Sequence, residues 1–312
     1  MRDQPLISII TPSLNQAKFL EQTVTSVLAQ DYPLIEYLVV DGNSTDGSQS
    51  IIKKYEKKIA WWVSEPDHGQ AEAINKGLKR SKGEIVAWLN SDDYYLPGAV
   101  TKAVAAFRKH PLSSFIYGDV LAVDAKGRQL NKLHFPQWNL VDLMKFNIIG
   151  QPSVFIRRDV LNQTGFLDES LHYLLDHQLW LRLAYQAPNQ YLPELLSGAH
   201  FHSQSKNVAK ASAFGEEAYR IITWMQSKSE YENLYEKNKN KIWAGAHRFN
   251  ARYLLDGDQP WAAFKSYMQC IFADLPTALP EWYRIVFSLA ATVGLGNLKR
   301  LHPRWRRQND GE

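Results

Sequence analysis

Short apolar runs alternate with segments of helical periodicity over the first 90 residues of the chain. Each run is four to six residues long, and polar or glycine- and proline-containing stretches separate the runs. This alternation is typical of a parallel sheet wound with helices. It predicts strands at residues 6–10, 35–40, 60–63 and 85–89.

Between the predicted strands, apolar residues recur at spacings of three and four, as on one face of a helix. The first predicted helix ends before Pro33, because proline cannot continue it. The strand at 85–89 is apolar throughout, as expected for a central strand covered on both faces. The helices are marked by Leu20, Val24, Val27 and Leu28, by Ile51, Ile52 and Tyr55, and by Ala71, Ile74 and Leu78.

Polar loops follow three of the predicted strands, at residues 11–15, 41–47 and 90–93. In open sheets of this kind, ligands bind beyond the carboxyl ends of the strands. We therefore expect the three loops to converge on one edge of the sheet and to form a binding site there.

The pattern changes near residue 206, where helical segments with scattered aromatic residues replace the strand–helix alternation. A chain of 312 residues with 45% hydrophobic residues is long enough for one large domain and a smaller appendage. We predict an α/β domain at 1–205 and a helical region at 206–312.

Charge and cysteine content narrow the classes of function. The formal net charge of +4 is small, and no basic stripe with interleaved aromatic residues occurs in the first 200 residues, so nucleic-acid binding is not expected. One cysteine, Cys270, permits no intrachain disulfide and fits a reducing cytosol. The N-terminus lacks a signal-peptide pattern and no run of about 18 apolar residues occurs, which predicts a cytoplasmic location.

The apolar segment at 280–295 begins with aromatic residues and precedes a basic cluster that includes Arg304, Arg306 and Arg307. It is too short to span a bilayer. One interpretation is peripheral contact with the inner face of the membrane, with the arginines on anionic lipid. The other is a helix packed on the α/β domain or on a dimer partner.

Asp92 and Asp93 are adjacent carboxylates at the end of an apolar strand. Their burial is costly unless a cation compensates the charge. Mg²⁺ or Mn²⁺ fits, because these hard cations take oxygen ligands and commonly bridge carboxylates to phosphate oxygens. The alternative is a solvated turn or a helix cap.

Around the Asp pair, short motifs occur in a fixed order between roughly residues 5 and 205. They are TPSLN (11–15), SVLAQDYP (26–33), VVDGNSTDG (39–47), EPDHG (65–69), AINKG (73–77), GEIVAWLNSDD (83–93), QP (151–152), GFLD (165–168) and LWLR (179–182) behind Asp176. This set resembles the family 2 glycosyltransferases. The resemblance implies a GT-A fold, which is Rossmann-like with a mostly parallel central sheet wound with helices, and here carries a helical C-terminal extension.

The resemblance also implies a role for individual residues. Asp41 matches the aspartate that reads the nucleotide base, with an acidic helix cap as the alternative. Asp92 matches the contact to the ribose or sugar, and Asp93 matches the ligand of the metal on the diphosphate. The other residues implied in nucleotide-sugar binding are Thr11, Pro12, Asn15 and Asn75.

Asp176 matches the catalytic base of the family, which removes the proton from the acceptor hydroxyl. The chain departs from the family pattern beside it: Leu175 stands where an acidic residue is usual, and Gln178 where a second aspartate is common. A helix N-cap is the alternative for Asp176.

Two histidines, His200 and His202, lie on one side of a segment expected to be extended. His202 resembles the late histidine of the family, which joins Asp93 at the metal or touches the diphosphate. A purely structural role is the alternative for both histidines.

The implied reaction is inverting transfer of a sugar from a nucleoside-diphosphate sugar, with UDP favoured, to a hydroxyl of a glycan or lipid-linked acceptor. Synthesis of cell-surface polysaccharide is the implied context. Two rivals stay open: a sugar nucleotidyltransferase on a similar fold, and a non-catalytic nucleotide-sugar-binding protein. The first generally carries an N-terminal glycine-rich basic loop, which this sequence lacks, and the second would not need Asp176.

Overall fold

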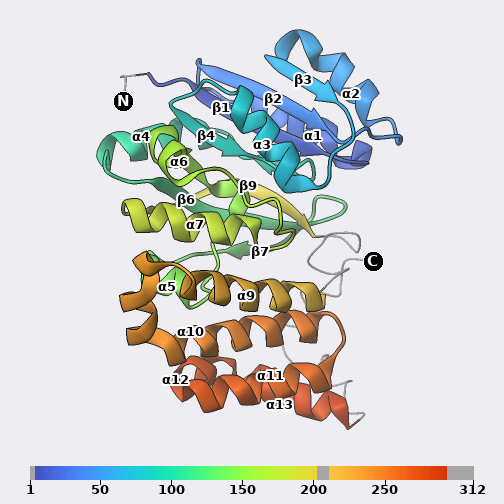
Figure 1. Ribbon diagram of the computed structural model, residues 1–312. Coiled ribbons are helices and arrows are strands. Elements are labelled where there is room, and N and C mark those ends of the chain that lie inside the picture. The colour runs from blue at the N-terminus through green and yellow to red at the C-terminus, as the bar shows by residue number, and fades with distance from the viewer. Residues whose placement is uncertain (1–3, 202–210, 294–312) are drawn as a thin grey trace. The chain divides into compact units, whose positions relative to one another are not determined.

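The computed structural model describes residues 4–201 and 211–293, which fall into two compact units (Figure 1). The first unit contains the chain up to Asn139 and Ile149–His200. The second contains Leu140–Ile148 and the chain from Phe201 onward. The short stretch at Leu140–Ile148 therefore joins the C-terminal helices, which the hydropathy pattern did not indicate.

Four parallel strands form the N-terminal half of the sheet, in the order β3-β2-β1-β4. Each predicted strand is present, although β1 and β2 run one to three residues further into the polar loops than the apolar runs suggested. The strands are β1 (Ile7–Ser13), β2 (Ile35–Asp41), β3 (Trp61–Ser64) and β4 (Ile85–Trp88).

Beyond β4 the strands pair in antiparallel fashion, so the sheet is mixed. Parallel pairing is confined to the first four strands, a smaller part of the sheet than expected. The order continues β4-β8-β6-β9-β5, with β7 paired to β6. Two of these strands have three residues each, too few for a period to be visible in the sequence. They are β5 (Asp93–Tyr95), β6 (Phe115–Asp124), β7 (Gln129–Leu133), β8 (Phe155–Arg157) and β9 (Gln190–Phe201).

Helices cover both faces of the sheet, and alternating side chains of β1 show which helix lies on which face. Ile9 packs in one cluster with residues of α1, α2 and α4. Ile10 lies against Gly77 of α3, where an added Cβ would be 2.5 Å from its Cγ2. The helices of this unit are α1 (Ala17–Leu28), α2 (Ser48–Tyr55), α3 (Gln70–Arg80), α4 (Ala99–Lys109), α6 (Arg158–Thr164) and α7 (Leu175–Gln186).

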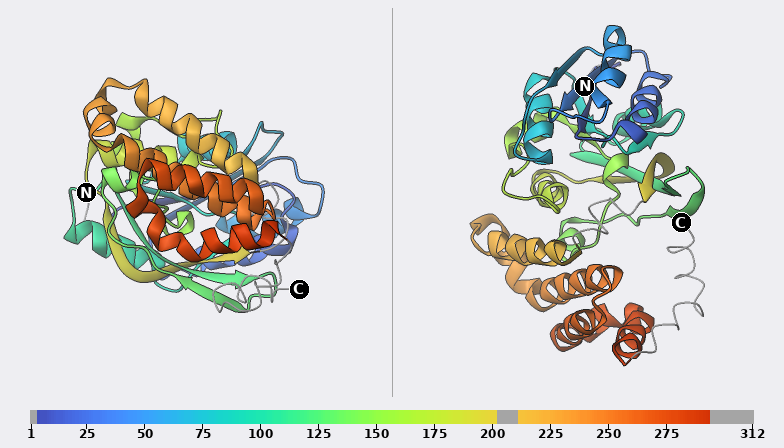
Figure 2. Two further views of the ribbon diagram at one scale, coloured as in Figure 1. Left: turned by 90° about the horizontal axis from the view of Figure 1, so that it is seen from below. Right: turned by 90° about the vertical axis from the view of Figure 1, so that its right-hand side faces the viewer.

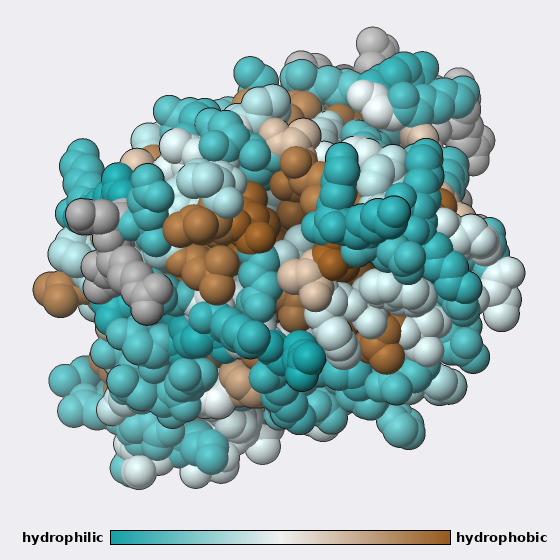
Figure 3. Space-filling model, turned by 90° about the horizontal axis from the view of Figure 1, so that it is seen from above, coloured by the Kyte–Doolittle hydropathy of each residue, from teal (hydrophilic) through white to brown (hydrophobic). Residues whose placement is uncertain are grey.

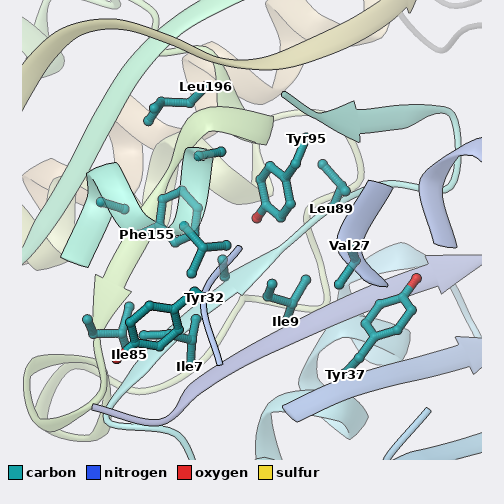
Figure 4. Close-up of a cluster of buried hydrophobic side chains, with 14 of the residues drawn as sticks. Ile7, Ile9, Val27, Tyr32, Tyr37, Ile85, Leu89, Tyr95, Phe155 and Leu196 are labelled. Atoms are coloured by element: carbon teal, nitrogen blue, oxygen red, sulfur yellow. The ribbon is translucent and has the colours of Figure 1, made fainter. Parts of the chain in front are cut away.

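The core on the α1 side joins all parts of the sheet (Figure 4). Ile7 and Ile85 on neighbouring parallel strands are fully buried, and so is Phe155 on β8. The Phe155 ring stacks on Tyr95 with the centroids 5.5 Å apart. Full burial of such a side chain contributes about 1.5–3 kcal/mol, so this core stabilises the strand ends that carry the polar loops.

The second unit is helical, as expected for the C-terminal region, and its long helices lie side by side (Figure 2). Gly245 of α10 approaches the backbone of Lys145 so closely that an added Cβ would be 2.0 Å from the Lys145 carbonyl oxygen. The described helices are α5 (Leu140–Met144), α9 (Ala211–Gln226), α10 (Ser229–Asp256), α11 (Pro260–Ala273), α12 (Leu275–Ala278) and α13 (Trp282–Thr292).

A buried ion pair ties α10 to the start of α13. The carboxylate of Glu281 pairs with Arg252, and its second oxygen lies 3.4 Å from Nε of Arg284. Burial alone would raise the pKa of Glu281, but the hydrogen bond from Arg252 and the surrounding arginine charges lower it. Glu281 therefore stabilises the fold while it is ionised.

Replacing Glu281 with alanine is expected to destabilise the second unit by about 3 kcal/mol, because the partly buried Arg252 and Arg284 lose the buried carboxylate that pairs with both of them. Urea unfolding measures this loss. In the wild type this contribution should fade as the pH drops through the lowered pKa of Glu281. The control is Glu236→Ala, since Glu236 pairs with Lys239 at 3.9 Å on the surface and should change stability by less than about 0.5 kcal/mol.

Candidate active site

The loops after β1 and β2 are joined by hydrogen bonds at the carboxyl edge of the sheet. The Asn15 amide donates to Ser44 Oγ at 2.8 Å, and Asn15 Oδ1 accepts from the Thr45 amide at 2.9 Å. Asp46 Oδ2 accepts from the Ala17 amide, also at 2.8 Å. The two loops therefore form one rigid rim.

Asp41 ends β2 and is fully buried. Its carboxylate accepts three hydrogen bonds: from the Ser44 amide at 2.9 Å, from Ser44 Oγ at 2.5 Å and from Ser64 Oγ at 2.6 Å. These donors offset the cost of burying the charge. Asp41 is consequently held in one orientation under the rim.

Thr11 and Pro12 are buried near the end of β1. The Thr11 hydroxyl accepts a hydrogen bond from Tyr37 at 3.0 Å. The Thr11 side chain therefore points to the face of the sheet on which Tyr37 packs with α1. Asn15 has φ of 52°, a left-handed conformation that asparagine tolerates better than most residues. Thr11 and Pro12 thus form the floor of the rim, and the more exposed Asn15 its outer wall.

Asp67, to which the sequence analysis gave no role, lies against the same rim. Its Oδ2 is so near Gly42 that a Cβ on that glycine would be 2.7 Å away. The pKa of Asp67 is raised, mainly by burial and also by the negative charges of Glu72 and Asp41. A hydrogen bond from the Gly69 amide opposes this shift. The EPDHG motif could have indicated that Asp67 lies at the site, because this aspartate stands between the carboxyl end of β3 and the start of α3.

Asp93 is 7% exposed and lies beside the partly exposed Asp92 at the carboxyl end of β4. Asn90 Nδ2 donates to Asp93 Oδ2 at 3.2 Å. Burial and the charge of Asp92 raise the pKa of Asp93 well above its usual value, more than the Asn90 hydrogen bond lowers it. A divalent cation would relieve the repulsion between the two carboxylates and favour the ionised form of Asp93. Such a cation needs only one or two carboxylates when phosphate oxygens complete its coordination shell.

Amide side chains for which the motifs indicated no role orient the Asp93 loop from both sides. Gln70 Nε2 donates to Asn90 Oδ1 at 2.7 Å, and Asn90 Nδ2 also donates to Gln151 Oε1 at 3.1 Å. Gln151 Nε2 in turn donates to the carbonyl of Trp88 at 2.9 Å. The chain of hydrogen bonds connects α3, β4 and the segment before β8.

Asn75 is buried and both ends of its amide are used. Its Nδ2 donates to the carbonyl of Leu167 at 2.9 Å and to Glu169 Oε1 at 2.8 Å, while its Oδ1 accepts from the Leu167 amide at 3.0 Å. These contacts fasten α3 to the segment that leads into α7.

Asp176 lies in the first turn of α7, which two contacts fix against the sheet. Trp180, one turn further along the same helix face, stacks on Trp88 of β4 with centroids 5.3 Å apart. His172, just before α7, lies 3.6 Å from the position of a Cβ on Gly69, at the start of α3. The start of α7 therefore lies at the carboxyl edge, where α3 also begins.

His200 is buried next to the Asp pair. Its Nδ1 donates to the Asp92 carbonyl at 2.7 Å, and its ring packs on Phe19 and Tyr94 with centroids 4.7 and 5.6 Å apart. His200 thus fastens the end of β9 to the Asp92 loop. His202 lies outside the described residues, and within residues 4–201 and 211–293 no group of three or more His, Cys, Asp or Glu side chains forms a metal cluster.

Sequence comparison decides the family. The family model described as glycosyl transferase family 2 matches residues 8–164, which is just over half of the chain. The chain belongs to glycosyl transferase family 2. The matched region of this family 2 chain ends before α7, so it contains the rim and the Asp pair but not Asp176.

Relatives of this family 2 chain include proteins named for polysaccharide synthesis. It is 36% identical to the putative teichuronic acid biosynthesis glycosyltransferase TuaG of Bacillus subtilis, over 58% of this chain and 72% of that protein. It also matches three longer Rickettsia proteins at 30–31% identity and spans only 34–36% of their length.

Solved structures confirm the GT-A fold for this family 2 chain. One is TarS 1–349 of S. aureus in complex with UDP-GlcNAc, with a TM-score of 0.58, 18% identity and coverage of 89% of this chain and 91% of that one. Another is the mannosyltransferase PcManGT of Pyrobaculum calidifontis in complex with GDP-Man and Mn²⁺, with a TM-score of 0.62, 19% identity and coverage of 99% and 84%.

Proposed function

We propose that the chain is a metal-dependent, inverting glycosyltransferase that moves a sugar from a nucleoside-diphosphate sugar to a hydroxyl acceptor. The observation that carries the proposal is the buried Asp93 beside Asp92, at the edge where the rim with Asp41 also lies. Membership of family 2 supports the reaction class.

The donor is proposed to bind along this edge. Asp41 and the β1 rim would recognise the base, Asp92 the ribose or sugar, and Asp93 a Mg²⁺ or Mn²⁺ ion on the diphosphate. The UDP-GlcNAc complex of TarS supports UDP as the favoured base, and the GDP-Man and Mn²⁺ complex of PcManGT supports a divalent metal. When bound, the ion would offset the charge that builds on the leaving diphosphate.

Asn75 is proposed to act indirectly on the nucleotide sugar, because its amide is already occupied by Leu167 and Glu169. It would position the segment before α7, and with it Asp176. His202 stays proposed as the histidine that joins Asp93 at the metal or touches the diphosphate.

Asp176 is proposed as the base. Its carboxylate would take the proton of the acceptor hydroxyl while that oxygen bonds to the anomeric carbon and the bond from this carbon to the diphosphate breaks. Attack opposite the leaving group inverts the anomeric configuration.

Calorimetric titration of UDP, GDP, CDP and dTDP tests the donor site. We expect one of them to bind in the presence of Mn²⁺ and to lose most of its affinity in EDTA. Equal binding with and without metal, or no binding of any of the four, would contradict the proposed site.

The acceptor is proposed to be a glycan or lipid-linked saccharide of a cell-surface polysaccharide, reached from the cytoplasm. The name of TuaG supports this context. None of the described helices is both long and apolar enough to span a bilayer.

An apolar stripe on α13 supports peripheral membrane contact. Trp282, Val286, Leu289 and Val293 recur at spacings of four, three and four, and they are 64%, 60%, 46% and 68% exposed. On the face that Figure 3 shows, hydrophilic residues surround the hydrophobic patches. The sequence after the stripe is basic, which favours a surface of anionic lipid.

The double variant Trp282→Ser, Val286→Ser is expected to bind vesicles rich in phosphatidylglycerol about tenfold more weakly than wild type, since less apolar surface enters the interface. Co-sedimentation measures the bound fraction. Leu112→Ser is the control, because Leu112 is 75% exposed on the first unit and outside the stripe. A wild type that stays in the supernatant would remove the membrane interpretation.

A further inference from the structure

A second polar cluster lies in the first unit, outside the donor site. Asp119 of β6 accepts hydrogen bonds from His134 Nδ1 at 2.6 Å, from the Tyr191 hydroxyl at 2.8 Å and from the Phe135 amide at 3.2 Å. The Asp119 side chain is 5% exposed, whereas the His134 side chain is 67% exposed. A buried acid thus holds a histidine ring at the surface.

The segment that carries His134 is fixed at several points. The Tyr117 hydroxyl donates to the Pro136 carbonyl at 2.7 Å and accepts from the Trp138 amide at 2.8 Å. Gln137 Nε2 donates to Asn189 Oδ1 at 2.9 Å. The histidine is therefore preorganised, which lowers the entropic cost of binding a ligand.

Asp119 also selects the form of the His134 ring. A carboxylate accepts hydrogen bonds, so Nδ1 carries the proton, and Nε2 is left as an acceptor when the ring is neutral. Burial raises the pKa of Tyr191 to about 12, and the bond to Asp119 adds to this, so Tyr191 also remains a donor toward Asp119. Among the residues the structure describes, no hydrogen bond engages Nε2 of His134.

The sheet register places this cluster close to the Asp pair. Val86 of β4 pairs with Ile156 of β8, which pairs with Phe115 of β6. β4 and β6 therefore run in the same direction, and continuing this register by four residues brings Asn90, two residues past the end of β4, level with Asp119. Two strand spacings separate them, which is roughly 10 Å.

The cluster also lies on the face of the sheet that α7 covers. Phe115 and Trp88 both pack on Trp180 of α7, with centroids 5.3 Å away in each case. Asp119 is four residues from Phe115 along β6, so its side chain points to that same face. Asp176 lies in the first turn of the same helix.

We propose that His134, held by Asp119, binds a hydroxyl group of the acceptor saccharide through Nε2. This inference rests on the proposed function. The strand order places Asp41 two strands to one side of β4 and Asp119 two strands to the other. Since inversion requires the acceptor to approach opposite the leaving diphosphate, the side away from the rim is the acceptor side.

Kinetics with methyl glycosides as acceptors test this role, using the nucleotide sugar that the wild type hydrolyses fastest. His134→Ala is expected to raise the acceptor KM about 5- to 10-fold, the loss of one hydrogen bond, without a matching rise in the donor KM. His110→Ala is the control, because His110 caps α4 at the opposite end of β6. This control should change neither constant.

The variant Asp119→Asn tests whether Asp119 sets the tautomer of the His134 ring or only stabilises the fold around it. The new amide group would keep its oxygen toward the Tyr191 hydroxyl and the Phe135 amide and turn its NH₂ toward His134, which forces the proton from Nδ1 to Nε2. A saccharide hydroxyl can also accept from a protonated Nε2, but it must turn to do so. We therefore expect the acceptor KM to rise by no more than in His134→Ala, and ¹⁵N spectra of the ring to report the exchanged tautomer.

Three results would overturn the inference. They are an unchanged acceptor KM in His134→Ala, a wild-type Nε2 that already carries the proton at neutral pH, and a wild type that hydrolyses its donor but transfers to no methyl glycoside. A wild type that hydrolyses no nucleotide sugar would instead overturn the proposed function together with this inference.

Discussion

Asp176→Asn is expected to lower the rate of sugar transfer by about 10³-fold while the donor binds as in wild type. The amide keeps the shape of the side chain and its position in the first turn of α7, but it cannot take the proton of the acceptor hydroxyl. Trp180 on Trp88 keeps the helix in place, so the loss should lie in kcat rather than in the donor affinity.

Single-turnover transfer and calorimetric donor titration together measure this split. Asp159→Asn is a matched control, because Asp159 is also an aspartate in the first turn of a helix but is 57% exposed and paired with Arg157. Full turnover of Asp176→Asn would assign the base to another residue. A loss of donor binding equal to the loss of turnover would make Asp176 a structural residue.

Asp93→Asn is expected to abolish metal-dependent binding of the nucleoside diphosphate. The amide keeps one oxygen but removes the negative charge that a divalent ion needs at this buried position. Among the residues that the structure describes, the side-chain donor to Asp93 is the neutral amide of Asn90, which does not neutralise the carboxylate. Titration with UDP or GDP in Mn²⁺ measures the loss, which should exceed about 100-fold.

The same variant is expected to be at least as stable as wild type without metal. The raised pKa of Asp93 means that the folded protein holds this proton more tightly than the unfolded chain. Wild-type stability should therefore fall as the pH rises above the ordinary aspartate range, and Asp93→Asn should lack this part of the fall. A variant that melts well below wild type in EDTA would show that Asp93 is structural instead.

The apolar runs predicted the parallel half of the sheet because each run is long enough to show its pattern. Strands β1 to β4 follow within one to three residues. Strands β5 and β8 were not assigned, since they have three residues each and carry no readable period. Leu140–Ile148 belongs to the second unit and is approached closely by Gly245 of α10, a contact that no hydropathy pattern reveals.

The order of the motifs predicted that the candidate residues lie at one edge of the sheet, but it did not predict what each side chain contacts. Asp41 and Asp93 are buried, which that order did not show. Asn75 was predicted to contact the nucleotide sugar, but its amide hydrogen-bonds to Leu167 in the segment before α7. Asn90 and Gln151 were missed, because a supporting hydrogen bond between distant segments leaves no spacing signal in one sequence.

The most direct test of the central claim is the release of nucleoside diphosphate from a panel of nucleotide sugars by the intact chain. Our account predicts that at least one donor is consumed with Mn²⁺, that EDTA stops the reaction, and that Asp93→Asn and Asp176→Asn are both inactive, the first without donor binding and the second with it. Release that continues in EDTA, or at the wild-type rate in both variants, would contradict the account.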